Sequence, residues 1–199
     1  MTSRSFWGHA SVSILAVAAL AGGSLGCQGP FVWTGQNENG EAAGMVVSDG
    51  DVLVYVCGGD QSFLTLHSWL NGEVISNNSV QVYSEQWDGY GYLDSQSAWF
   101  DVSDPQGNFV SFQMDSARDD IDGLYEVFDS GCRTGAVVWT DSAGEAHLQG
   151  VWCDEQGNRA QVTPVGPVTL TNEGIQVSID LTQIGLTGEK TLYVTRAEP

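Results

Sequence analysis

Short apolar or alternating runs, each ended by turn-forming residues, follow one another from Phe31 to the end of the chain. Residues 175–181 alternate between apolar and polar side chains, which is typical of a strand with one dry face. Turn residues such as Ser48-Asp49-Gly50, Asn71-Gly72 and Gln156-Gly157-Asn158 separate the runs. Turn residues at such short intervals exclude long helices and predict an all-β fold.

The runs predict a chain of antiparallel strands joined by short loops. Such a meander hides its edges by closing as a barrel or by folding into a two-sheet sandwich, and both remain open. At most one short helix is expected, over residues 116–128, where apolar residues recur at helical spacing. The expected strands cover residues 44–48, 52–57, 63–70, 80–84, 90–94, 98–103, 109–114, 136–140, 146–153, 159–163, 175–181 and 191–195.

The first residues have the three parts of a secretory signal. Arg4 supplies positive charge, residues 12–21 form an apolar core, and Gly22-Gly23-Ser24 are small. The apolar core is shorter than the roughly 20 residues that a membrane-spanning helix needs. We therefore expect a signal peptide over residues 1–26 and a single all-β domain with a short N-terminal tether over residues 27–199.

The segment Ser24-Leu25-Gly26-Cys27 resembles the lipobox of bacterial envelope lipoproteins, although the leucine lies one position closer to the cysteine than in that pattern. The resemblance implies that Cys27 is lipidated and becomes the mature amino terminus. The domain would then be anchored to the membrane of the bacterial envelope, on the outer membrane or facing the periplasm. The alternative is cleavage after Ala19-Leu20-Ala21, which gives a secreted protein.

Acidic residues outnumber basic ones strongly, with 25 Asp and Glu against six Lys and Arg, so the formal net charge is -19. Phosphate backbones require a basic surface, which excludes nucleic acid as a partner. Anionic lipid is also a poor electrostatic partner. Any contact with a membrane should therefore come from the lipid anchor at Cys27 rather than from the folded domain.

An exported chain with four cysteines invites a search for disulfides. If residues 141–144 form a four-residue hairpin loop, Thr140 lies opposite Glu145, and Cys132 then lies opposite Cys153. We therefore predict a disulfide between Cys132 and Cys153. Cys57 either pairs with Cys27 or stays free.

Motifs that carry catalysis are not found in the sequence. After the signal the only histidines are His67 and His147, and neither has metal-ligand spacing or belongs to a known nucleophile motif. The protein is therefore expected not to be an enzyme. The alternative is a hydrolase whose site is assembled from scattered Asp, His and Ser residues.

The densest acidic cluster consists of Asp115, Asp119, Asp120 and Asp122. Calcium prefers several oxygen ligands on one loop, so these carboxylates are a candidate calcium site. Their spacing does not match the EF-hand pattern, and a solvated acidic turn is the simpler interpretation. No other cofactor is expected.

Aromatic residues are concentrated between positions 87 and 100. Trp87, Tyr90, Tyr92 and Trp99 could stack a sugar ring or a small apolar ligand, because flat rings beside polar groups bind such ligands. The alternative is that these rings fill the core of the sheet. The sequence thus predicts an exported, lipid-anchored β-domain that binds a glycan, a small apolar ligand or an envelope protein, or that serves as structure.

Overall fold

Fifteen strands and one 3-10 turn make up the fold, in a computed structural model that describes residues 30–76, 78–104 and 106–199. The predicted signal peptide and Cys27 lie outside the described residues. The all-β prediction is confirmed, and the one short helical element is the turn η1 (Leu181–Ile184). Within the described ranges, no helix has the length and apolar character needed to cross a membrane.

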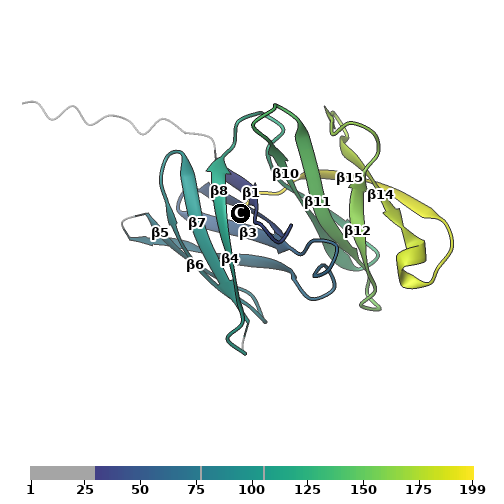
Figure 1. Ribbon diagram of the computed structural model, residues 1–199, viewed down its shortest axis with the longest axis horizontal. Helices are drawn as coiled ribbons and strands as arrows, with labels where there is room; N and C mark the ends of the chain where they lie inside the picture. The colour runs from purple at the N-terminus through teal and green to yellow at the C-terminus, as the bar shows by residue number, and fades with distance from the viewer. Residues whose placement is uncertain (1–29, 77, 105) are drawn as a thin grey trace, which may run out of the picture.

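The first eight strands form a closed antiparallel barrel, barrel 1, in which each strand pairs with the next and β1 pairs with β8. Figure 1 shows it in the purple-to-teal half of the molecule. The strands are β1 (Phe31–Gln36), β2 (Ala42–Ser48), β3 (Asp51–Cys57), β4 (His67–Ser76), β5 (Ser79–Tyr83), β6 (Asp88–Leu93), β7 (Ser97–Ser103) and β8 (Phe109–Ser116).

Six later strands close a second barrel, barrel 2, in the order β9-β10-β11-β12-β14-β15 and back to β9. The short strand β13 pairs with β14 at its edge. The strands are β9 (Gly123–Asp129), β10 (Cys132–Thr140), β11 (Ala146–Cys153), β12 (Arg159–Pro164), β13 (Leu170–Thr171), β14 (Gly174–Asp180) and β15 (Glu189–Arg196). The sequence left a barrel and a two-sheet sandwich open, and the structure shows barrels.

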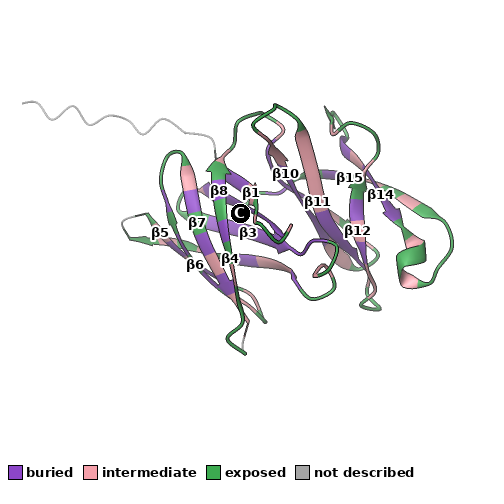
Figure 2. Ribbon diagram, viewed as in Figure 1, coloured by how far each residue is buried: buried purple, intermediate pink, exposed green. Residues whose placement is uncertain are grey.

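Each barrel has its own apolar interior, and a third apolar cluster joins the two barrels. Strand β3 shows how the three clusters are built, because it is buried on both faces (Figure 2). Val52, Val54 and Val56 point into barrel 1, whereas Leu53 and Tyr55 pack against barrel 2. The uninterrupted apolar run in this strand therefore reflects two buried faces rather than one.

Two glycines allow the barrels to approach each other closely. A Cβ atom on Gly135 of β10 would lie 2.5 Å from the ring of Tyr55, and one on Gly44 of β2 would lie 2.3 Å from Leu124 Cδ2. Hydrogen bonds add to this contact, including those from Gln149 Nε2 to the carbonyl oxygens of residues 40 and 58, at 2.9 and 2.8 Å. The interface is therefore packed like a protein interior, and it holds the barrels in one arrangement.

The helix considered over residues 116–128 is not formed. Residues 123–129 are strand β9, which pairs with β10 and β15. Neighbouring residues of β9 are apolar because Leu124 faces barrel 1 and Tyr125 faces the interior of barrel 2. Two buried faces on one strand thus gave a spacing that resembles a helix.

The turn expected at Asn71-Gly72 is also absent, because β4 runs straight through both residues. A Cβ atom on Gly72 would lie 1.9 Å from the carbonyl oxygen of Gln81 on the neighbouring strand. The glycine therefore serves a close approach of two backbones rather than a turn.

Candidate functional site

Three large aromatic side chains of the neighbouring strands β6 and β7 lie on the outer surface of barrel 1. Tyr90 and Tyr92 of β6 and Trp99 of β7 are 48%, 49% and 46% exposed. Tyr92 lies directly opposite Trp99 in the antiparallel pair, and the Tyr90 hydroxyl donates a hydrogen bond to Ser79 Oγ at 3.2 Å. We call Tyr90, Tyr92 and Trp99 the aromatic face, and it is not part of the core.

The side of β6 that faces the barrel interior explains why these rings point outward. Gly89 and Gly91 alternate with the two tyrosines, and a Cβ atom on Gly89 would lie 2.5 Å from the ring of Phe100. Phe100, fully buried, fills the space that inward side chains of β6 would occupy. Trp87 is separate from the aromatic face, because it packs partly buried against the core of barrel 1. The core interpretation is thus correct for Trp87 and wrong for the other three.

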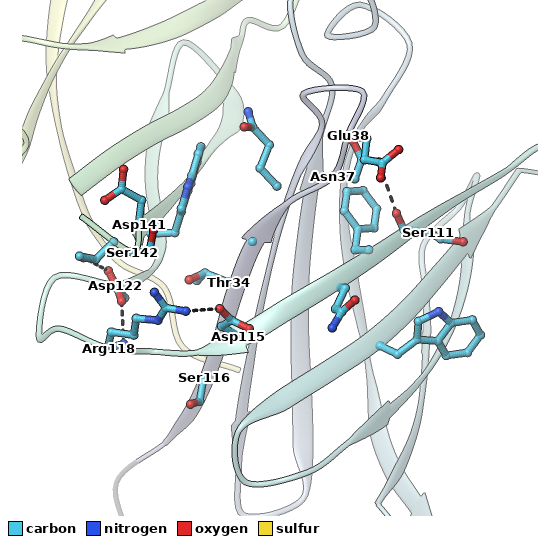
Figure 3. Close-up of a pocket in the computed structure, with 17 residues that line it drawn as sticks. Thr34, Asn37, Glu38, Ser111, Asp115, Ser116, Arg118, Asp122, Asp141 and Ser142 are labelled. Carbon is cyan, nitrogen blue, oxygen red and sulfur yellow. Dashed lines mark hydrogen bonds and ion pairs between the residues drawn. The ribbon is translucent and has the colours of Figure 1, made fainter. Parts of the chain in front are cut away.

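The aromatic face leads into an open cleft between the two barrels, with a volume of about 740 Å³. Its walls come from β1, β7 and β8 of barrel 1 and from the loop before β9 and the β10–β11 hairpin of barrel 2 (Figure 3). Trp99 lines the cleft from one side and Trp139 from the other. The interface that holds the barrels together therefore also sets the width of the cleft.

Charged side chains in the cleft wall are mostly acidic. They are four carboxylates, Glu38, Asp115, Asp122 and Asp141, and one guanidinium, Arg118. Arg118 forms an ion pair with Asp115, as Figure 3 shows. The cleft therefore has an excess of negative charge, in keeping with the whole chain.

The four aspartates of the candidate calcium site have different surroundings. Asp115 is paired with Arg118, while Asp119 and Asp120 are exposed. Asp122 is buried, and its carboxylate accepts hydrogen bonds from the backbone N–H of Arg118 at 2.7 Å and from Thr140 Oγ1 at 2.6 Å. The buried carboxylate thus links the loop before β9 to the end of β10, and the four side chains are not brought together.

A different group has metal-ligand proximity. Among the residues that the structure describes, Asp141, Glu145 and His147 are the one group of three or more His, Cys, Asp or Glu residues whose ligand atoms all lie within 4.8 Å of one another. Asp141 Oδ2 lies 3.0 Å from His147 Nε2, and Asp141 Oδ1 accepts hydrogen bonds from the backbone N–H of Ala143 and Glu145. The contact with His147, and after it the bonds from the two backbone N–H groups, hold the pKa of Asp141 below its usual value. The carboxylate therefore organises the β10–β11 turn.

His147 also holds an aromatic side chain of the cleft wall. Its ring stacks on Trp139, with ring centroids 5.5 Å apart and planes 21° apart. Across the part of the chain that the structure describes, no hydroxyl group hydrogen-bonds to His147. Asp141, His147 and Trp139 therefore form a chain of contacts that orients the indole, without the nucleophile that a catalytic triad requires.

His67, the other candidate histidine, lies at the start of β4, partly buried, opposite Cys57 of β3. Its Nδ1 atom is buried without a hydrogen-bond partner. Burial and the nearby positive charge of Arg159 lower the pKa of His67 to about 4, from an ordinary value of 6.5. It is therefore neutral in the folded protein near neutral pH.

This histidine predicts a pH dependence of stability. Between pH 6.5 and about 4 the unfolded chain binds a proton at His67 that the folded protein excludes, so the free energy of unfolding should fall as the pH decreases through this range. Chemical denaturation at several pH values should show this loss in the wild type and a smaller one in His67→Gln. His147→Gln is the matched control and should retain the loss. Equal losses in His67→Gln and wild type would contradict the prediction.

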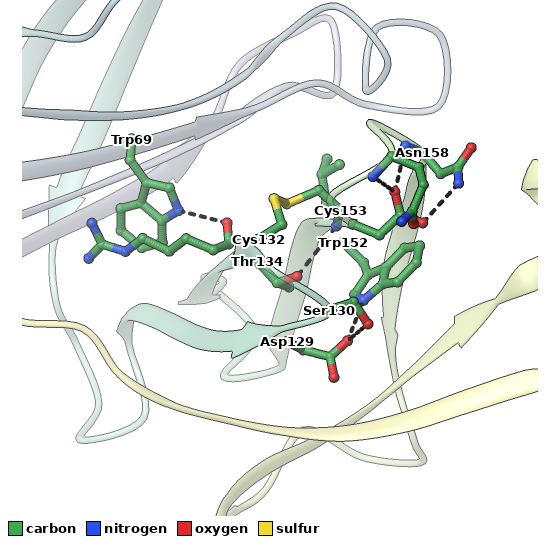
Figure 4. The surroundings of a disulfide bond; sticks show 12 residues. Trp69, Asp129, Ser130, Cys132, Thr134, Trp152, Cys153 and Asn158 are labelled. Atoms are coloured by element: carbon green, nitrogen blue, oxygen red, sulfur yellow. Dashed lines mark hydrogen bonds between the residues drawn. A yellow bond between two sulfur atoms is a disulfide. The ribbon is translucent and has the colours of Figure 1, made fainter.

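The predicted disulfide between Cys132 and Cys153 is present (Figure 4), with Cα atoms 5.6 Å apart. The register used to predict it is wrong by one residue, because Thr140 lies opposite Ala146 rather than Glu145. The regular pairing of β10 and β11 ends at Gly135 and Val151. Beyond that point the backbone N–H of Cys153 bonds to Thr134 Oγ1 at 3.4 Å, and this irregular end lets the cysteines meet despite the shifted register.

Of the remaining cysteines, the structure describes only Cys57, which is buried and unpaired in the interface between the barrels. Its Sγ lies 3.7 Å from the carbonyl oxygen of Gln149 in barrel 2. Burial raises the pKa of this thiol to about 12, so it stays protonated. Cys57 thus packs as a small apolar side chain.

Comparison with known proteins adds no relative. The chain matches no family model, no curated protein and no solved structure. Of the sequence-predicted ligand-binding residues, the structure brings Tyr90, Tyr92 and Trp99 together. The cleft residues Gln36, Gln113, Arg118 and Trp139 were missed, and no local pattern marks them, since they come from four separate segments.

Proposed function

We propose that this protein is an exported, lipid-anchored protein of the bacterial envelope whose two-barrel domain binds a ligand and does not catalyse a reaction. The observation that carries the binding role is the aromatic face, three rings about half exposed on adjacent strands that lead into the inter-barrel cleft. Large rings exposed together usually mark a binding surface, since each leaves apolar area in contact with water.

The cysteines support the anchor at Cys27. If Cys27 is lipidated, three cysteines remain and one of them has no disulfide partner. Cys132 and Cys153 form the bridge, and Cys57 is the unpaired one, enclosed in the apolar interface. Cys27 is then left for acylation, as the lipobox resemblance implies. The acidic fold contributes no attraction to anionic lipid, so the acyl chains would provide the membrane attachment.

The anchor predicts a covalent lipid on one residue. When the full chain is expressed with its own signal in a Gram-negative host fed alkynyl palmitate, the wild type should be labelled and found with membranes. Cys27→Ser should be unlabelled and soluble. Cys57→Ala, the matched cysteine control, should be labelled like the wild type. An unlabelled wild-type protein whose intact mass is that of a chain beginning at Gly22 would contradict the proposal and support ordinary secretion.

The binding role is tested with the purified domain and three immobilised fractions of the host envelope, namely polysaccharide, lipid and protein. The proposed function predicts binding to one fraction that is weakened in Trp99→Ala and unchanged in Tyr193→Ala. Tyr193 of β15 is a suitable control because it is 40% exposed on barrel 2 and lies outside the cleft wall. Equal binding by wild type and Trp99→Ala would overturn the binding role of the aromatic face.

The second candidate is a hydrolase, and one observation favours it, the 3.0 Å contact between His147 Nε2 and Asp141 Oδ2 beside Ser142 at the cleft. Both oxygens of Asp141 are already engaged, and His147 is stacked on Trp139, which favours a structural role. Hydrolysis of an envelope fraction that is lost in His147→Gln and retained in His67→Gln would establish the hydrolase instead.

A further inference from the structure

Trp99 belongs both to the aromatic face and to the cleft, so it joins the two into one path across barrel 1. Tyr92 of β6 lies opposite Trp99 of β7, and Trp99 lies opposite Gln113 of β8. Neighbouring strands are spaced by about 4.8 Å, so the three side chains form a row perpendicular to the strands. The row ends in the cleft, where Gln113 is part of the wall.

Polar groups beside Trp99 suit hydroxyl groups. No hydrogen bond joins the side-chain amide of Gln113 to another residue in the described ranges, so its donor and acceptor are free for a ligand. Asp115 lies on the same face of β8 two residues further, paired with Arg118. Planar amide, carboxylate and guanidinium groups can each bond two neighbouring hydroxyls, while an aromatic ring covers the C–H face of the same sugar.

The opposite wall supplies a second ring. Trp139 of barrel 2 lines the cleft, and its stacking on His147, which is in turn bonded to Asp141, restricts how the indole can turn. A ligand that leaves Trp99 through the cleft therefore reaches the part of the Trp139 side chain that lines the opposite wall. Prearranged rings of this kind reduce the entropy lost on binding.

The charge of the site excludes anionic ligands. Four carboxylates and one guanidinium line the cleft, and the whole chain has a net charge of -19. A chain of uronic acids or phosphates would meet repulsion along the whole path. A small apolar ligand would cover the side-chain amide of Gln113 without giving it a hydrogen-bond partner.

We propose that the row of Tyr92, Trp99 and Gln113, together with Trp139 on the opposite wall of the cleft, binds an uncharged glycan chain that lies across the strands of barrel 1. This inference rests on the proposed binding function and names its ligand class. The cleft is open, so the chain would be bound along its length rather than held by its end.

The test is calorimetric titration of the whole purified domain with uncharged hexasaccharides of β-glucan, xylan, mannan and chitin, and with an oligogalacturonate as the anionic probe. At least one uncharged hexasaccharide should bind with a Kd of about 1 mM or tighter, and its trisaccharide more weakly. Trp99→Ala and Tyr92→Ala should each weaken binding by about tenfold or more, and Gln113→Ala by about three- to tenfold. Trp99→Phe should retain most of the affinity, and Tyr193→Ala all of it.

Any one of three results would overturn the proposal. The first is that no uncharged hexasaccharide binds, and the second is that the oligogalacturonate binds more tightly than the uncharged hexasaccharides. The third is that wild type and Trp99→Ala bind equally well when both have the same melting temperature. If the oligosaccharides fail but an envelope fraction still binds in a Trp99-dependent way, the glycan class is wrong and the binding function stands. If both experiments fail, both proposals are wrong.

Discussion

Tyr55→Ala should lower the free energy of unfolding by about 3–5 kcal/mol, the usual cost of removing a large buried aromatic side chain. Tyr55 is almost fully buried where the two barrels meet, with its ring centroid 4.6 Å from that of Trp69. Its hydroxyl accepts a hydrogen bond from the backbone N–H of Val151 in barrel 2, at 3.3 Å. The substitution therefore leaves a cavity and an unpaired N–H group in the interface that sets the cleft.

Chemical denaturation of three variants separates these contributions. Tyr55→Phe keeps the ring and removes only the acceptor, so it should cost about 1–3 kcal/mol. Tyr193→Ala, on the exposed surface of barrel 2, is the control and should stay within about 0.5 kcal/mol of the wild type. A Tyr55→Ala protein within 1 kcal/mol of the wild type would show that the interface contributes little to stability.

Loss of the disulfide should be the second large effect. Replacing both Cys132 and Cys153 with serine should lower the free energy of unfolding by about 3 kcal/mol, because the unfolded chain gains the freedom of a loop with a sequence separation of 21 residues. The bridge also ties the start of β10 to the end of β11, where their regular pairing has stopped.

Denaturation with and without reductant measures this effect. Reductant should lower the stability of the wild type to that of the double variant and leave the variant unchanged. The variant itself controls for other effects of the reductant, including any on Cys57. Labelling of Cys132 by an alkylating reagent in the oxidised native protein would contradict the disulfide.

Most strands could be predicted because each depends on a short pattern and on the turn that follows it. Strand β14 alternates clearly, and Ile175, Val177 and Ile179 are all buried as expected. The sequence predicts strand β9 and the Asn71-Gly72 segment wrongly for a shared reason, since distant packing partners determine both. Leu124 is apolar because of barrel 1, and Gly72 is a glycine because of the backbone at Gln81.

Part of the candidate site was visible in the sequence, and part was not. The concentration of rings around positions 87–100 identified Tyr90, Tyr92 and Trp99, but it could not tell them from the core residue Phe100, since Trp99 and Phe100 are consecutive and point to opposite faces. Alternation shows that two faces differ, not which one meets water. Gln113, Arg118 and Trp139 approach Trp99 only in the folded protein.

By itself, the sequence determined the all-β class and the antiparallel strands, because these depend on periodicity and turns within a few tens of residues. It also placed Cys132 and Cys153 in one hairpin, while the irregular strand end that brings them together belongs to the folded structure. Tertiary structure alone decided that the strands close as two barrels, that a third apolar cluster joins them, and that an acidic cleft opens beside Trp99. These features depend on contacts between residues far apart in the chain. Such contacts follow from how two curved sheets fill space against each other, which no local pattern records.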